Sequence, residues 1–206
     1  NNKTLQGAVD KVFNLNRLKK RTVTNISVTD RGYSEIKSLK FAGVDKSVFV
    51  SVNAVTPISS ILANYVKKGN HNVNKNELSI SFIIDIDGYY LYFGGDTMNG
   101  HIDAINPAYL EQCRFVKIPH HSSDTSTNLL NYLPQEIDTA CTTIFSAHKL
   151  PKKLVLQEYC NIGKVFSTGS DNNKKYNYGV VEYEYDFSKE EAEMNVKLHG
   201  NAIGLN

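Results

Sequence analysis

LSISFIIDIDGYYLYFGGD, residues 78–96, carries the clearest local pattern in the sequence. The apolar run at 80–84 predicts one strand, and YYLYF at 89–93 predicts a second strand that returns beside it. Between the two strands, Asp87-Gly88 is a dipeptide typical of a two-residue hairpin turn. The stretch therefore predicts an antiparallel β-hairpin whose second strand ends at a pair of glycines.

Shorter apolar segments on both sides of this hairpin indicate a larger sheet. Further strands are predicted at 22–28, 34–43, 47–53, 114–119, 139–145 and 164–169, with an antiparallel pair at 178–187 and 192–200. Helices are predicted at 5–20, 57–68, 126–133 and 151–162. Because strands and helices alternate in the second half of the chain, we expect an α/β fold with helices packed on a sheet.

Composition places the chain among ordinary globular proteins. The 206 residues, 41% hydrophobic and 21% charged, predict a single domain over 1–206 and argue against disorder or a coiled coil. A net charge of +2 argues against a general polyanion binder. No apolar run approaches the ~20 residues of a membrane helix, and no signal peptide, with its cationic and then apolar segment, is recognised. Cys113, Cys141 and Cys160 are read as reduced thiols of a cytoplasmic protein.

Gly94-Gly95-Asp96-Thr97 is the first candidate for chemistry, because it directly follows the predicted strand YYLYF. A carboxylate on the loop that leaves a strand is held rigidly and exposed to ligands, and glycines allow close approach. The alternative is that Asp96 caps the N-terminus of the next helix with help from Thr97.

Ile118-Pro119-His120-His121-Ser122-Ser123 is the second candidate and also follows a predicted strand. Imidazole is a common ligand of zinc and similar ions, so one ring of the histidine pair is expected to bind metal. The other ring is expected to contact substrate or a neighbouring carboxylate. The alternative is an exposed loop with two incidental histidines.

Ser146-Ala147-His148-Lys149 repeats the same arrangement after the predicted strand at 139–145. Three polar clusters at one edge of adjacent strands are what a site in an α/β fold requires. The other histidines, His71, His101 and His199, lack this context. His71 and His199 are interpreted as surface or structural residues, and His101 is noted because it is close to Asp96 in the sequence. Lys174 and Lys175, beside Tyr176 and Tyr178, fit a solvated loop, and the alternative is a place where phosphates or bases of a nucleic acid bind.

The order NELSISFIIDIDGYYLYFGGDT, FVKIPHHSSDTSTNLL, IFSAHK resembles the C-terminal half of a metallo-β-lactamase-fold hydrolase of the ComEC-like branch, over about residues 47–170. The resemblance implies an αββα sandwich with two divalent metal ions, zinc or alternatively manganese. Asp96 resembles the carboxylate that bridges the two metals, and one of His120 and His121 resembles the last metal ligand. The sequence does not distinguish the two histidines, and the working assignment places His121 on the metal and His120 in catalysis.

The resemblance also implies a substrate side of the site. His148 matches a loop position with a polar, catalytic residue, and Lys149 and Ser122 are predicted to bind substrate. Ser122 is a departure, because members of the branch carry Lys-x-x-His-His-Gly-Ser and have glycine there. The implied function is hydrolysis of phosphodiesters, with nucleic acid as the first candidate substrate and nucleotides or other small phosphoesters behind it. A lactonase or thioesterase on the same fold is a third interpretation.

The largest departure is the absence of H-x-H-x-D-H, the first metal-binding motif of the family, from these 206 residues. One interpretation is that an upstream segment or a companion chain supplies the missing ligands. The other is a degenerate homologue that no longer binds metal and serves as an interaction module in a larger assembly.

Overall fold

A computed structural model describes residues 33–39, 48–55, 76, 79–143, 153–169, 179–186 and 193–206. This part of the chain is a mixed α/β structure. Eight of its strands form one sheet in the order β1-β2-β3-β4-β5-β6-β7-β10, and β8 and β9 form a separate hairpin. The strands are β1 Tyr33–Leu39, β2 Val48–Ala54, β3 Phe82–Ile86, β4 Tyr89–Phe93, β5 Cys113–Lys117, β6 Thr139–Thr142, β7 Lys164–Ser167, β8 Val180–Asp186, β9 Glu193–His199 and β10 Ile203–Gly204.

The hairpin β3–β4 confirms the prediction made from the 78–96 stretch. Its turn residues Asp87 and Gly88 have φ of 54° and 88°, as a two-residue turn with left-handed backbone requires. The Gly88 amide donates to Asp85 Oδ1 at 2.8 Å, which closes the turn. The predicted start of the first strand is wrong, because β3 begins at Phe82 and Ile80 lies before it with 43% of its surface exposed.

The sheet changes from antiparallel to parallel at β4. Strands β1 to β4 are antiparallel neighbours, β4 to β7 pair in parallel, and β10 returns antiparallel to β7. Because β4, β5, β6 and β7 follow one another in one direction across the sheet, right-handed crossovers place their connecting helices on the same face. These are α3 Asn99–Ile102, α4 Pro107–Leu110, the 3-10 helices η2 Pro119–Ser122 and η3 Asp124–Asn131, and α5 Lys153–Cys160.

Two of the predicted helices lie among these connections. The helix predicted at 126–133 forms as the 3-10 helix η3, which begins earlier, at Asp124, and is interrupted by a non-helical backbone at Ser126. The helix predicted at 151–162 is confirmed as α5.

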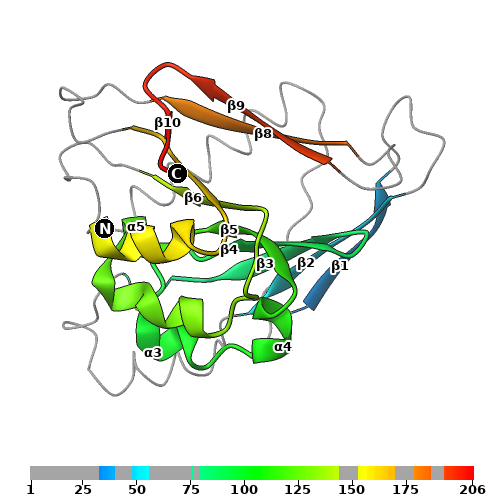
Figure 1. Ribbon diagram of the computed structural model, residues 1–206. Coiled ribbons are helices and arrows are strands. Elements are labelled where there is room, and N and C mark those ends of the chain that lie inside the picture. The colour runs from blue at the N-terminus through cyan, green and yellow to red at the C-terminus, as the bar shows by residue number, and fades with distance from the viewer. Residues whose placement is uncertain are drawn as a thin grey trace, which may run out of the picture.

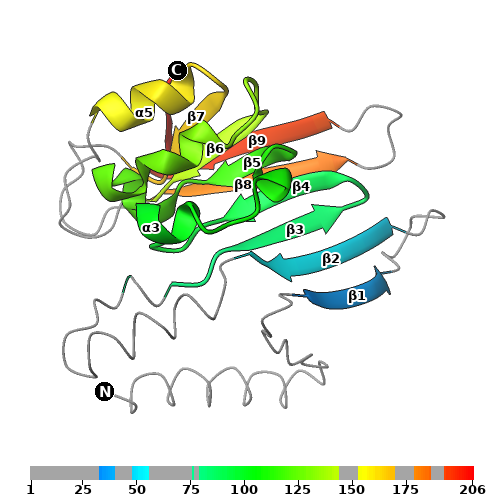
Figure 2. The ribbon, with the colours of Figure 1, turned by 90° about the horizontal axis from the view of Figure 1, so that it is seen from below.

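The described elements form three layers (Figures 1 and 2): the helices, the large sheet and the hairpin β8–β9 on its opposite face. Between helices and sheet lies the larger core, where Tyr92 and Tyr159 are fully buried. Between sheet and hairpin lies a smaller aromatic core, in which Tyr183 packs edge-on against Phe115 at 4.8 Å between ring centroids. The antiparallel pair predicted near the C-terminus is confirmed as β8 and β9. The structure adds that this pair forms a separate layer.

Several predictions fall on residues outside the described ranges. These are the elements at 5–20, 22–28 and 57–68, the cluster Ser146 to Lys149, the loop with Lys174 and Lys175, and His71. The three cysteines are free thiols, as predicted, although Cys160 is only half-buried. No helix of the described residues is long and apolar enough to span a membrane.

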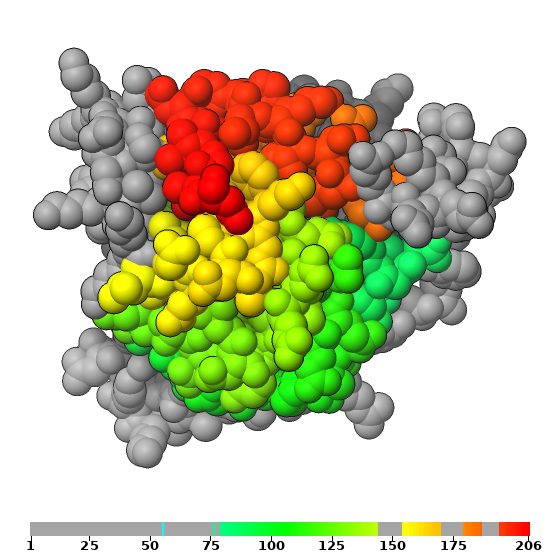
Figure 3. All heavy atoms as spheres, viewed as in Figure 1, coloured from blue at the N-terminus to red at the C-terminus, as the bar shows by residue number. Residues whose placement is uncertain are grey.

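A groove of about 1020 Å³ lies at the end of the parallel strands where β5 and β7 begin. Its walls come from the turn that follows α5 and from β9, which lie side by side in yellow and red in Figure 3. Two of the residues that line the groove are basic: Arg114, which forms a 2.7 Å ion pair with Asp138, and Lys164. None of the lining residues belongs to the clusters predicted to carry chemistry.

Candidate functional site

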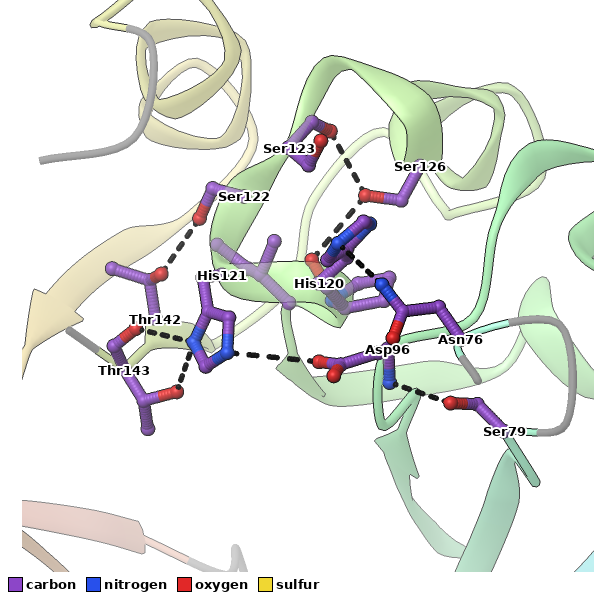
Figure 4. A network of polar contacts seen from close by, with 12 residues as sticks. Asn76, Ser79, Asp96, His120, His121, Ser122, Ser123, Ser126, Thr142 and Thr143 are labelled. Carbon is purple, nitrogen blue, oxygen red and sulfur yellow. Dashed lines mark hydrogen bonds and ion pairs between the residues drawn. The ribbon is translucent and has the colours of Figure 1, made fainter. Parts of the chain in front are cut away.

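The carboxyl ends of β4, β5 and β6 lie level with one another, since Phe93 pairs with Lys117 and Lys117 pairs with Cys141. The loops that leave these strands therefore meet at one edge of the sheet. They bring together Asp96 after β4, the histidine pair after β5, and Thr143 after β6 (Figure 4). This convergence of the first two clusters was predicted from the sequence.

Asp96 faces the histidines and does not cap a helix. The N-cap of α3 is Met98, which makes no side-chain cap bond, so the capping interpretation of Asp96 is wrong. Its backbone amide donates to Ser79 Oγ at 3.3 Å, and its side chain is 41% exposed. The carboxylate Oδ1 lies 3.7 Å from Nε2 of His121 (Figure 4).

Contacts on its other nitrogen fix the ring of His121. Nδ1 lies 2.9 Å from the carbonyl oxygen of Thr143 and 3.1 Å from Thr143 Oγ1. A carbonyl only accepts, so Nδ1 donates to it, and in the neutral form of the ring this tautomer leaves Nε2 as an acceptor. Two acceptors, Nε2 and the Asp96 carboxylate, then face each other, which is favourable only with a proton or a cation between them.

The spacing of these two acceptors fits a metal ion. Ligand bonds of 2.0–2.2 Å at tetrahedral angles put two zinc ligands roughly 3.3–3.6 Å apart, close to the 3.7 Å between His121 Nε2 and Asp96 Oδ1. A direct hydrogen bond would bring them to about 2.7–3.2 Å. The contact from a carbonyl to the far ring nitrogen is also the usual support of a histidine ligand. Among the described residues, however, no group of three or more His, Cys, Asp or Glu is placed to hold a metal.

His120 differs from His121 in its contacts, since its ring nitrogens lie against Thr125 and Asn76 and not against a carboxylate. Nδ1 lies 2.9 Å from Thr125 Oγ1, and Nε2 lies 2.9 Å from the side-chain amide of Asn76. Its backbone amide donates to the Gly95 carbonyl at 2.9 Å. The geometry therefore favours His121 over His120 as a metal ligand. The predicted catalytic role of His120 requires that the Asn76 amide release Nε2.

The histidine loop has an unusual backbone. His120, His121 and Ser122 have φ of 49°, 51° and 61°, the left-handed region that favours glycine and costs other residues about 1–2 kcal/mol each. Such strain concentrates at functional sites. Ser122 is fully buried and donates to Thr142 Oγ1 at 2.7 Å, which helps to hold this conformation. We therefore correct the predicted substrate contact of Ser122 to a structural role within the loop.

The glycine that follows β4 allows the two loops to touch. A Cβ at Gly94 would lie 2.7 Å from Pro119 Cβ and 3.0 Å from Tyr92 Cε1. Because Pro119 opens the histidine loop, Gly94 lets the Asp96 loop and the histidine loop pack directly together.

Replacing Gly94 with alanine is therefore expected to lower the free energy of unfolding by about 1–3 kcal/mol, since the core on that side has no room for a methyl group. The change also pushes Pro119 and the histidines away from Asp96. Chemical denaturation measures the stability. Gly100→Ala is the control, because nothing lies within 4 Å of a Cβ there. Equal stability of both variants would contradict the close packing.

Several residues of this edge were not predicted. Thr142 is the last residue of β6 and Thr143 follows it, so a polar pair at the end of a strand was the available signal. Asn76 and Ser79 precede β3, and nothing in their local sequence indicates a contact with Asp96 or His120. The predicted site residues His148 and Lys149 lie outside the described residues. His101, noted for its closeness to Asp96 in the sequence, is buried on α3.

The chain was compared with protein families, curated proteins and solved structures. No protein-family model, no curated protein and no solved structure matches the chain. The function is therefore inferred from the geometry of the site and from the sequence pattern around it.

Proposed function

We propose that this chain contributes Asp96 and His121 to the metal site of a phosphodiester hydrolase with a metallo-β-lactamase-like αββα fold. The observation that carries the proposal is the 3.7 Å approach of two acceptor atoms, Asp96 Oδ1 and His121 Nε2. Helices on one face of the sheet and a hairpin on the other support the sandwich part of the proposal.

In this proposal Asp96 and His121 would hold a divalent ion, zinc or alternatively manganese, and a second ion would complete the site. A bound ion of this kind would supply Lewis acidity and lower the pKa of a bound water to about 7. Thr143 keeps the proton of His121 on Nδ1, so that Nε2 stays a ligand. His120, oriented by Thr125, stands beside the site for contact with substrate.

The remaining metal ligands come, in this proposal, from a segment or companion polypeptide that carries the equivalent of H-x-H-x-D-H. The substrate class is a phosphodiester, with nucleic acid before nucleotides, and the resemblance to the ComEC-like branch supports this choice. The rival function is a catalytically inactive interaction module. It is favoured by the finding that the described residues place only two such ligand side chains together.

The two functions separate in one experiment on the native assembly purified through this chain, because the proposed site needs the ligands of the H-x-H-x-D-H equivalent as well as Asp96 and His121. Zinc retained after dialysis is measured by elemental analysis, and hydrolysis of bis(p-nitrophenyl) phosphate is followed with zinc or manganese. The proposal predicts retained zinc and metal-dependent hydrolysis that His121→Ala removes and His199→Ala, at an exposed histidine of β9, leaves unchanged. Neither metal nor hydrolysis in the unmodified assembly would favour the interaction module.

A further inference from the structure

Lys117 is the last residue of β5 and lies directly before the loop that carries the histidines. Its neighbours in register are Phe93 on β4 and Cys141 on β6, and residues level with one another in a sheet share a face. Both neighbours belong to the aromatic core under the hairpin β8–β9. The aliphatic stem of Lys117 therefore starts in an apolar layer.

The charged end of Lys117 turns out of this layer toward the site. Its Nζ donates to the carbonyl oxygen of Ile118 at 2.9 Å, one residue further along the chain toward the histidine loop. Long cationic side chains commonly bury the stem and bring the head to a polar edge in this way. Within the described residues this is the single hydrogen bond of Nζ, which leaves two N–H donors of the ammonium group for other partners.

The electrostatic surroundings agree with this placement. Burial lowers the pKa of Lys117, while Cys141 and the Asp96 carboxylate act in the opposite direction and favour the ammonium form. Lys117 is thus a partly desolvated cation that interacts electrostatically with the Asp96 carboxylate. A cation in such surroundings interacts more strongly with an anion than one in water does.

We propose that Lys117 is the anion-binding residue of the candidate site, and that its two remaining N–H donors contact phosphate oxygens of the substrate. The inference rests on the proposed function for the identity of the substrate, but the phosphate contact itself needs only Lys117 and the loop beside it. Lys117 is the lysine of the Lys-x-x-His-His pattern in this sequence, and the proposal gives that lysine a role. It also gives the preference for phosphodiesters over neutral esters a physical cause, because a neutral ester carries no charge for the ammonium to bind.

The test is the dissociation constant of inorganic phosphate, measured by NMR titration of the whole chain with and without one equivalent of zinc. Lys117→Met keeps an apolar stem of similar length, and Lys117→Gln serves as a second neutral variant if the methionine variant does not fold. We expect phosphate to bind roughly tenfold or more weakly to the neutral variants, the usual loss for a charged hydrogen-bond partner. Lys117→Arg retains the charge and is expected to stay within about threefold of the unmodified chain.

Lys164→Met is the matched control, because Lys164 is an exposed lysine at the opposite end of the sheet. It is expected to leave phosphate binding unchanged. Phosphate binding by the neutral Lys117 variants equal to that of the unmodified chain, or no phosphate binding by the unmodified chain, would overturn the inference. Failure of the proposed function is a separate result: zinc does not bind, whereas phosphate binding still depends on Lys117.

Discussion

Replacing Asp96 with asparagine is expected to weaken zinc binding by at least about 100-fold, since changes even to the supporting partners of a ligand cost 10- to 100-fold. The amide has the shape of the carboxylate but lacks its charge. Among the described residues, His121 is then the one remaining ligand of the proposed site. Competition with a chromophoric chelator measures the zinc affinity of both proteins.

Asp87→Asn is the control for this prediction. Asp87 is an exposed carboxylate in the β3–β4 turn with a φ of 54°, a backbone conformation that asparagine also adopts. The control is expected to bind zinc as the unmodified chain does. If both asparagine variants bind zinc equally well, Asp96 is not a ligand.

Replacing Tyr92 with alanine is expected to lower the free energy of unfolding by about 3–5 kcal/mol, the range found when buried aromatic side chains are removed from cores. Tyr92 lies on β4 with none of its surface exposed and packs in the core between sheet and helices. Urea denaturation followed by circular dichroism measures the loss.

Tyr92→Phe separates packing from hydrogen bonding in the same position. The Tyr92 hydroxyl donates to Ser81 Oγ at 3.1 Å, and Ser81 also contacts Thr97 Oγ1 at 2.7 Å, next to Asp96. Because Ser81 keeps the Thr97 contact, the phenylalanine variant is expected to lose only about 1 kcal/mol. An alanine variant as stable as the phenylalanine variant would show that this part of the core is not tightly packed.

Local patterns in the sequence were sufficient for much of the sheet. Asp87-Gly88 between two apolar runs predicts the β3–β4 hairpin, because that turn type requires left-handed backbone at both positions. The start of β3 was misplaced because Ile80 continues the apolar run although it lies outside the strand, half exposed. The 3-10 geometry of η3 follows from hydroxyl and backbone contacts around Ser123 and Ser126, which apolar spacing does not report.

The site was predicted in outline from a single rule. Polar residues that follow neighbouring parallel strands meet at one edge of a sheet, and this rule brought Asp96 and the histidine pair together. The rule gives no side-chain directions, so it did not assign the two histidines by geometry. The structure favours His121, because a left-handed backbone and the Thr143 carbonyl turn its ring toward Asp96. Lys117 belongs to the Lys-x-x-His-His pattern but was given no role, because its role depends on where a long side chain bends.

The most direct test of the account is a nitrogen-15 NMR spectrum of the histidine rings recorded before and after addition of zinc. The account predicts that the Nε2 resonance of His121 moves to a position typical of a metal-bound nitrogen, while His121 Nδ1 remains protonated and the nitrogens of His120 keep their positions. A ring spectrum that zinc leaves unchanged, or a change at His120 in place of His121, would contradict the assignment of the site.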